Sequence, residues 1–193
     1  MPRPLFLASR SPRRAELLRQ LGLRFEVLDV DIEEIRGVDE SASGYVDRVA
    51  REKAGAGLLQ VAAVPGAVVI GADTEVMLAD EVLGKPADAE AAGAMLRRLS
   101  GRAHRVLTVA WCVDAAREES AASESTVEFG GLDAPMIDAY VASGEPFGKA
   151  GAYAIQGRAA AFIRRLDGSY SGVMGLPLFE TAGLLRRFGV IAA

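Results

Sequence analysis

A cluster of basic side chains lies near the N-terminus of this 193-residue chain. Arg10, Arg13 and Arg14 fall within five positions, and Ser9 adds a hydroxyl group beside them. Guanidinium groups match phosphate oxygens in pairs, and helix N-termini supply further N–H donors to such anions. The cluster therefore indicates an anion-binding site. A solvated basic turn, partly offset by Glu16, is the alternative.

The residues around the cluster predict the elements that would position it. Residues 5–8 form a short apolar run suited to a buried strand, and apolar residues at helical spacing follow over 15–21. Ser11 and Pro12 are typical of the N-cap and the first residue of a helix. The two later arginines then lie in the first helical turn, where the helix dipole makes a cation unfavourable by roughly 0.3–1 kcal/mol. A bound anion would offset this cost.

A carboxylate and a lysine follow further along the chain. The buried run 68–70 is expected to end as a strand at 71–74, which contains Asp73. An aspartate at the end of a buried strand either caps a turn or lies where strand ends meet a ligand. A hairpin is predicted over 76–83, and it would bring Lys85 back beside Asp73.

A second lysine falls on the apolar face of a predicted helix over residues 43–60. Val46, Val49 and Ala50 define that face, and Lys53 continues it at helical spacing. Such a lysine either extends along apolar surface to reach solvent or points its ammonium group into a cleft. The pattern leaves both possibilities open.

Six carboxylates lie in the stretch 29–40, at Asp29, Asp31, Glu33, Glu34, Asp39 and Glu40. A solvated acidic loop is the usual form of such a run. Carboxylates opposite a phosphate-binding site also recruit Mg²⁺, so the stretch is a candidate source of metal ligands.

Composition limits the chemistry and the partners. The formal net charge of −4 does not fit a general nucleic-acid-binding protein. The single cysteine, Cys112, lies in an apolar run and is expected to be a packed core thiol. One histidine, His104, does not support a His-rich metal site or a Ser-His-Asp arrangement. No apolar segment is long enough for a signal peptide or a membrane span, so we expect a cytoplasmic protein without membrane partners.

The remaining pattern alternates strands and helices. Strands are expected at 25–29, 104–113 and 124–129, and helices at 88–101, 133–144 and 177–188. No linker rich in proline, glycine or serine marks a domain boundary, and no internal repeat is present.

Seven motifs follow one another along the chain. They are LASRSPRRAELL (7–18), REKA (51–54), GADT (71–74), GKP (84–86), LSGRAHRVLT (99–108), GKAGAYAIQG (148–157) and GSYSGVMGLPL (168–178). In these motifs the chain resembles the Maf nucleotide pyrophosphatases. The order and spacing of the motifs cover nearly the whole chain. Glu75 replaces a usual aliphatic residue and Gly172 a common asparagine, and neither change removes a catalytic group.

The resemblance implies an α/β fold of the Maf/inosine-triphosphatase type. It implies a long, mixed, twisted sheet with helices, in a single Maf-like domain over 1–193 with two lobes and an active site in the central cleft between them. It also implies cleavage of a nucleoside triphosphate to the monophosphate and pyrophosphate with Mg²⁺ or Mn²⁺. Homodimers are common in the family.

The resemblance and the residue patterns together assign catalytic roles. Asp73 would act as general base toward the attacking water, as a metal ligand, or as both. Lys53 and Lys85 would neutralise the triphosphate charge as it builds in the transition state. Glu34 is the expected second carboxylate at the metal, with Glu33 as the second choice. The lack of a usable histidine or cysteine fits direct attack by water.

Substrate binding is assigned in the same way. Ser9, Arg13 and Arg14 would hold the phosphates. In the resemblance, Arg13, Thr74 and Gln156 follow the pattern of the subgroup that acts on dTTP and UTP. The amide of Gln156 can accept the N3–H of uracil or thymine and donate to an adjacent carbonyl, which cytosine does not allow. A loop glutamine that bonds only to main chain is the alternative for this residue.

Two other functions remain open from the sequence. One is the sister Maf subgroup that acts on 7-methyl-GTP. The other is a non-catalytic nucleotide-binding regulator of septum formation, which would need the phosphate site but no positioned base. The presence of Asp73, Lys53 and Lys85 together favours the enzyme.

Overall fold

The computed structural model describes residues 3–79 and 81–192 as an α/β protein. In chain order the elements are β1 (Leu5–Ala8), α1 (Pro12–Gln20), β2 (Glu26–Leu28), α2 (Ala42–Gln60), β3 (Val68–Leu78), β4 (Glu81–Leu83), α3 (Ala89–Leu99), β5 (Ala103–Val113), β6 (Glu118–Phe129), α4 (Ala134–Ala142), the 3₁₀ helices η1 (Ala150–Ala152) and η2 (Arg158–Phe162), β7 (Ile163–Asp167), α5 (Tyr170–Met174) and α6 (Leu178–Arg187). Within the described ranges, no helix combines the length and hydrophobicity needed to cross a membrane.

The strands form one mixed sheet in the order β2-β1-β3-β5-β6-β7, and β4 pairs with β3. Strand β1 is parallel to β2 and to β3, whereas the β3–β4 and β6–β7 pairs are antiparallel. The α/β class and the mixed sheet expected from the sequence are therefore confirmed.

The chain divides into two compact units. Unit 1 comprises Met1–Asp73, Thr108–Ser123 and Gly175–Ala193, and unit 2 comprises Thr74–Leu107 and Glu124–Met174. Strands β3, β5 and β6 each contribute residues to both units.

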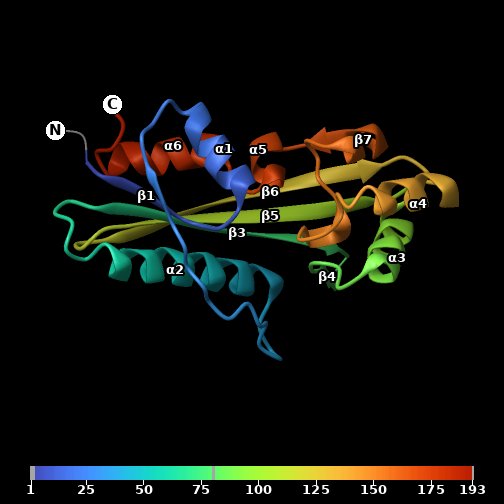
Figure 1. The fold of residues 1–193 in the computed structure, drawn as a ribbon, viewed down its shortest axis with the longest axis horizontal. Helices are drawn as coiled ribbons and strands as arrows, with labels where there is room; N and C mark the ends of the chain where they lie inside the picture. The colour runs from blue at the N-terminus through green and yellow to red at the C-terminus, as the bar shows by residue number, and fades with distance from the viewer. Residues whose placement is uncertain (1–2, 80, 193) are drawn as a thin grey trace. The chain divides into compact units, whose positions relative to one another are not determined.

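In unit 1, helices cover both faces of the parallel strands. Helix α2 lies against one face, and α1 and α6 lie on the opposite face (Figure 1). Burial on both faces accounts for the continuous apolar runs of β1 and β3, because a strand covered on both sides has no solvent-facing side to alternate with.

Helix α2 packs closely on the sheet because glycines lie at the contact. A Cβ atom on Gly57 would lie 2.8 Å from the Cβ of Ala8 and 2.9 Å from Val69 Cγ1. A Cβ atom on Gly71 of β3 would lie 2.5 Å from the main-chain N of Ala54 and 2.6 Å from the carbonyl oxygen of Ala50. Only a hydrogen atom fits at these two positions, so glycine fixes the distance between helix and sheet.

In unit 2, three aromatic side chains pack together between β5, β6 and the segment after η1. His104 contacts Phe129 and Tyr153 edge to face, with ring centroids 5.1 and 5.4 Å apart. His104 Nε2 lies 2.8 Å from the Tyr153 hydroxyl, and His104 Nδ1 has no hydrogen-bond partner among the described residues. Burial lowers the pKa of His104 to about 4.

Most predicted elements are confirmed. Ser11 is the N-cap of α1 with Pro12 at its first position, and Asp88 and Asp133 cap α3 and α4 as expected. The hairpin between β3 and β4 is present, with Val76 paired to Leu83. Cys112 is fully buried, and burial raises its pKa to about 12, as expected of a packed core thiol. Asp80, in the predicted hairpin turn, lies outside the described residues.

The predicted end of β3 at residues 71–74 is wrong. The strand continues without interruption to Leu78, so Asp73 lies inside it rather than at its end. Glycine and aspartate suggested a break, but Gly71 serves the close helix contact and the residues beyond Thr74 are again buried.

The structure differs from the predicted elements in three further places, where the sequence is polar or irregular. Strand β6 begins at Glu118, six residues before the predicted start, because polar residues occupy its exposed face. Strand β7 and helix α5 were not predicted, since Ile163–Asp167 and Tyr170–Met174 are too short and polar to show a clear period.

The glycine contact under α2 predicts a stability difference between two alanine variants. Gly71→Ala should lower the free energy of unfolding by about 1–3 kcal/mol, because the new Cβ meets main-chain atoms that cannot rotate away. Gly55→Ala is the matched control on α2, where a Cβ would meet nothing within 4 Å. It should be neutral or stabilising by up to about 1 kcal/mol. Urea denaturation measures both; equal effects would contradict the packing argument.

Burial of His104 predicts a loss of stability on acidification. Its pKa is about 4 in the folded protein and about 6.5 when unfolded, so between these values the unfolded chain binds the extra proton. Unfolding free energy should therefore fall by about 3 kcal/mol as the pH drops from 6.5 to 4. His104→Phe removes this titration, so the difference between the urea curves of the two proteins isolates it. Parallel pH profiles would refute the assignment.

Candidate active site

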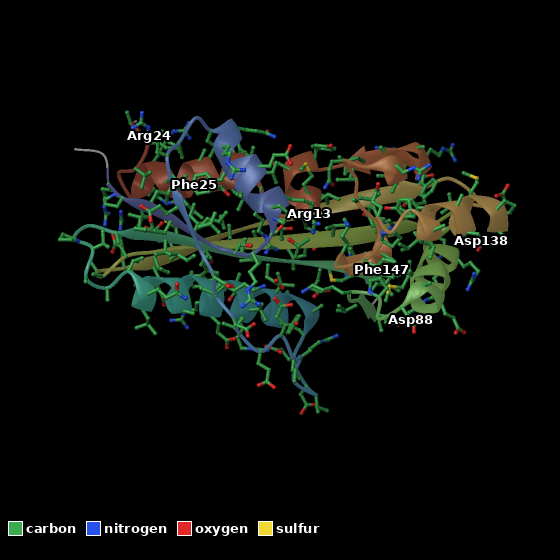
Figure 2. All side chains as sticks on the ribbon, in the orientation of Figure 1. Arg13, Arg24, Phe25, Asp88, Asp138 and Phe147 are labelled. Carbon is green, nitrogen blue, oxygen red and sulfur yellow. The ribbon has the colours of Figure 1, made fainter. Side chains whose placement is uncertain are left out.

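The N-terminus of α1 has the features expected of an anion-binding site. Its N-cap hydroxyl, on Ser11, accepts a hydrogen bond from the Arg14 N–H at 3.5 Å, and its first turn contains no acidic residue. Arg13 is half-buried at this end of the helix (Figure 2). Among the described residues, no carboxylate forms an ion pair with Arg13, and burial followed by repulsion from Arg14 lowers its pKa.

Arg14 is held in place by hydrogen bonds within unit 1. Its Nε donates to the carbonyl oxygen of Gly175 at 2.8 Å, and its Nη1 donates to the Ser9 hydroxyl at 3.4 Å. The Ser9 hydroxyl also accepts from the Ser11 N–H at 3.2 Å. We refer to Ser9, Arg13 and Arg14 as the α1 site.

Arg10, the third arginine of the sequence cluster, is used differently. Its guanidinium group pairs with Asp29 and with Asp31, which follow strand β2. These exposed ion pairs join Arg10 to two of the six acidic residues rather than to the α1 helix.

Lys53 forms the centre of a second group, the acid–lysine cluster of Lys53, Asp73 and Glu34. The Lys53 ammonium lies 2.7 Å from Asp73 Oδ1 and 2.6 Å from Glu34 Oε1. Lys53 and Asp73 are only 8% and 7% exposed, whereas the Glu34 side chain is 32% exposed. The lysine thus does not extend to solvent; it is a buried cation held by two carboxylates.

The α1 site and the acid–lysine cluster interact electrostatically. Burial lowers the pKa of Arg14, and the negative charges of Asp73 and Glu34 oppose that shift. The two carboxylates are therefore close enough to act on the arginine that the α1 site presents. Both groups belong to unit 1.

The acidic stretch 29–40 supplies one residue to this cluster. Glu40 instead pairs with Arg48, which lowers the pKa of Glu40 to about 2, and Glu33 is exposed. Glu34 is the residue that reaches Lys53, the ion-pair partner of Asp73. This geometry favours Glu34, the first choice from the sequence, over Glu33 as the carboxylate that shares Lys53 with Asp73.

The donor set of Asp73 and Glu34 fits a hard divalent cation. Mg²⁺ is commonly bound by one or two carboxylates together with substrate phosphates, and here two carboxylates converge on one ammonium group. Within the described part of the chain, no group of three or more histidine, cysteine or acidic side chains could bind a metal. A cation at this pair would complete its coordination with water molecules and substrate phosphate oxygens.

The remaining candidate residues belong to unit 2. Thr74 is half-buried in β3, immediately after Asp73. Lys85 follows β4 and is exposed. Gln156 is exposed in a turn that Gly157 closes by donating its N–H to the carbonyl oxygen of Ala154 at 3.0 Å.

Sequence reasoning missed Glu145 and Tyr140. Glu145 lies in residues 144–150, which resemble a P-loop but lack its length and its hydroxyl residue, so the pattern predicts no role for this carboxylate. The structure connects Glu145 to the Gln156 turn through hydrogen bonds. The signal that could have found it is Gly157, whose missing side chain gives the carboxylate room.

Fold and site together define an α/β protein with a cationic helix N-terminus close to a buried acid–lysine cluster. Residues 4–188 match the family model described as Maf-like protein, and the chain belongs to the Maf family.

Relatives and solved structures extend this comparison. A protein named dTTP/UTP pyrophosphatase from Xanthomonas euvesicatoria is 59% identical over 187 residues, covering 96% of this chain and 98% of that one. Another of the same name from Aromatoleum aromaticum is 52% identical over 196 residues, covering 96% and 95%. The Ham1 protein of Staphylococcus aureus is similar to this chain with a TM-score of 0.48 and 14% identity, over 96% and 97% of the two chains.

Proposed function

We propose that this protein hydrolyses dTTP and UTP to the nucleoside monophosphate and pyrophosphate. The observation that carries the proposal is the buried Lys53 ammonium held by Asp73 and Glu34, two carboxylates that also act electrostatically on Arg14 of α1. The names of relatives 52–59% identical over nearly the whole chain support the substrate assignment.

The α1 site binds the triphosphate in this proposal. The helix N-terminus and the guanidinium groups of Arg13 and Arg14 supply donors to phosphate oxygens, and the Ser9 hydroxyl adds another. Burial, followed by repulsion from Arg14, lowers the pKa of Arg13, and an incoming anion would offset both effects.

Asp73 activates the water in this proposal. It accepts a proton from a water molecule whose oxygen attacks the α-phosphorus. The bond between the α-phosphorus and the oxygen that bridges it to the β-phosphate breaks, and pyrophosphate leaves. Lys53 holds the Asp73 carboxylate in position and, with Lys85, neutralises charge that builds on the phosphates.

Asp73 and Glu34 would hold the divalent cation, Mg²⁺ or Mn²⁺, that the family resemblance implies. When bound, such a cation neutralises phosphate charge and lowers the pKa of a coordinated water. Because Lys53 already contacts both carboxylates, its ammonium group must share them with the cation.

Gln156 and Thr74 select the base in this proposal. The Gln156 amide pairs with the N3–H and a carbonyl of uracil or thymine, whereas cytosine would leave polar groups unpaired at a cost of about 1–3 kcal/mol. The homodimer and the cytoplasmic location expected from the sequence stay predictions.

A nucleotide panel tests the reaction and the substrate together. With Mg²⁺ present, dTTP and UTP should release pyrophosphate well above the rates for CTP, ATP and 7-methyl-GTP. In ¹⁸O-water the label should enter the nucleoside monophosphate, since water attacks the α-phosphorus. Label in orthophosphate, or turnover unaffected by EDTA, would refute the mechanism. A preference for 7-methyl-GTP would assign the chain to the sister subgroup, and binding without turnover would indicate a regulator.

Asp73→Asn tests the proposed base. The amide keeps the shape of the side chain but cannot accept the proton of water, so kcat for dTTP should fall by roughly 10²-fold or more. Asp138→Asn on α4, where the carboxylate is exposed (Figure 2), is the control and should keep wild-type activity. Circular dichroism checks that both variants are folded. An Asp73→Asn enzyme with near wild-type kcat would show that Asp73 is structural.

A further inference from the structure

The turn that presents Gln156 is anchored on both sides. Before it, the Ala154 N–H donates to the Tyr140 hydroxyl oxygen at 3.2 Å. After it, the Arg158 N–H donates to Glu145 Oε2 at 3.1 Å and the Ala159 N–H donates to Glu145 Oε1 at 3.5 Å. All of these residues belong to unit 2.

Tyr140 and Glu145 are themselves joined. The Tyr140 hydroxyl donates to Glu145 Oε1 at 2.9 Å, so one continuous hydrogen-bonded path runs from Ala154 to Arg158 around the base of the turn. Tyr140 is 3% exposed, and its ring packs edge to face on Phe162, with centroids 5.1 Å apart. The path therefore passes through the Tyr140 side chain, which packing holds in place. We call Tyr140 and Glu145 the turn anchor.

Gly157 allows the carboxylate to approach this closely. A Cβ atom at Gly157 would lie 2.2 Å from Glu145 Oε1 and 2.6 Å from Oε2. Its φ of −106° is open to any residue, so the glycine is needed for space rather than for backbone conformation. The turn beside Gln156 is thus shaped around the Glu145 carboxylate.

The anchor holds its charge state. Burial opposes ionisation of Glu145. The hydrogen bonds from the Arg158 N–H, the Tyr140 hydroxyl and the Ala159 N–H, together with the charge of Lys149, outweigh burial and lower the pKa of Glu145. Burial, followed by the bond to Glu145, raises the pKa of Tyr140. The tyrosine stays a donor and the carboxylate an acceptor at neutral pH.

We propose that Tyr140 and Glu145 are positioning residues for base selection, acting through the orientation of the Gln156 amide. An exposed glutamine discriminates between uracil and cytosine only if its amide plane is held, because a rotated amide can satisfy either base. The turn anchor fixes the backbone on both sides of that side chain. This inference rests on the role given to Gln156 in the proposed function.

Tyr140→Phe tests the inference with little change in shape. It removes the hydroxyl that joins Ala154 to Glu145 and should lower the ratio of kcat/KM for dTTP over CTP by about tenfold, the factor that corresponds to one misplaced hydrogen bond. Glu145→Gln is the second variant. It has one acceptor oxygen in place of two, so it cannot accept from Arg158, Ala159 and Tyr140 together.

Tyr153→Phe is the matched control. It removes another buried tyrosine hydroxyl from the residue next to Ala154, but that hydroxyl bonds to His104 rather than to the anchor. The dTTP-to-CTP ratio of Tyr153→Phe should stay within about twofold of wild type. Thermal unfolding of the variants separates lost selectivity from lost stability.

A double variant tests the route of the effect. If the anchor acts through Gln156, Tyr140→Phe should not lower the ratio further in a Gln156→Ala background. An equal loss of selectivity in Tyr140→Phe and Tyr153→Phe, or an additive loss in the double variant, would overturn the inference.

Amide hydrogen exchange keeps this test separate from the proposed function. Exchange at Ala154, Arg158 and Ala159 should accelerate in Tyr140→Phe and Glu145→Gln relative to Tyr153→Phe. A wild-type enzyme with no preference for dTTP over CTP would refute base selection by Gln156, and with it the role given to the anchor. Faster exchange would then show an anchor that is structural only. A selective wild type with unchanged exchange in both variants would overturn the inference and leave the proposed function intact.

Discussion

The candidate site depends on the ion pairs that the buried ammonium group of Lys53 forms with two carboxylates. The ammonium group lies within 2.7 Å of carboxylates from a mid-strand residue, Asp73, and from a loop residue, Glu34. Removing one partner from a buried ion pair typically costs about 3–5 kcal/mol, because the charge left behind stays desolvated. The three side chains therefore constrain one another, and the loop that carries Glu34 is tied to the sheet through the lysine.

This ion pair forms because helix α2 approaches β3 closely. Gly71 leaves the main chain of Ala54 and Ala50 in contact with the strand, two residues before Asp73. A lysine on the buried face of α2 then reaches an acid inside the strand instead of extending to solvent. Small residues at the contact thus decide which partner the lysine meets, and packing sets the electrostatics of the site.

Burial and neighbouring charges both act on the arginines of the site. Burial disfavours the charged form of Arg14, whereas Asp73 and Glu34 favour it. Burial also disfavours the charged form of Arg13, and repulsion from Arg14 adds to this effect. A phosphate chain brings negative charge to the arginines and relieves that repulsion. In the proposed function, the same carboxylates would hold a divalent cation together with phosphate oxygens. The anion and the cation would then bind together.

Sequence by itself determined the elements whose signals are local. Ser11 with Pro12 specified the start of α1, and the buried face of α2 predicted where Lys53 would lie, because capping and helical periodicity depend only on near neighbours. The tertiary structure alone decided the partners: Lys53 meets Asp73 through the space left by glycine, and the polar loop residue Glu145 anchors a turn eleven positions beyond it. Such contacts join residues distant in the chain, so no local period records them, and only packing brings them together.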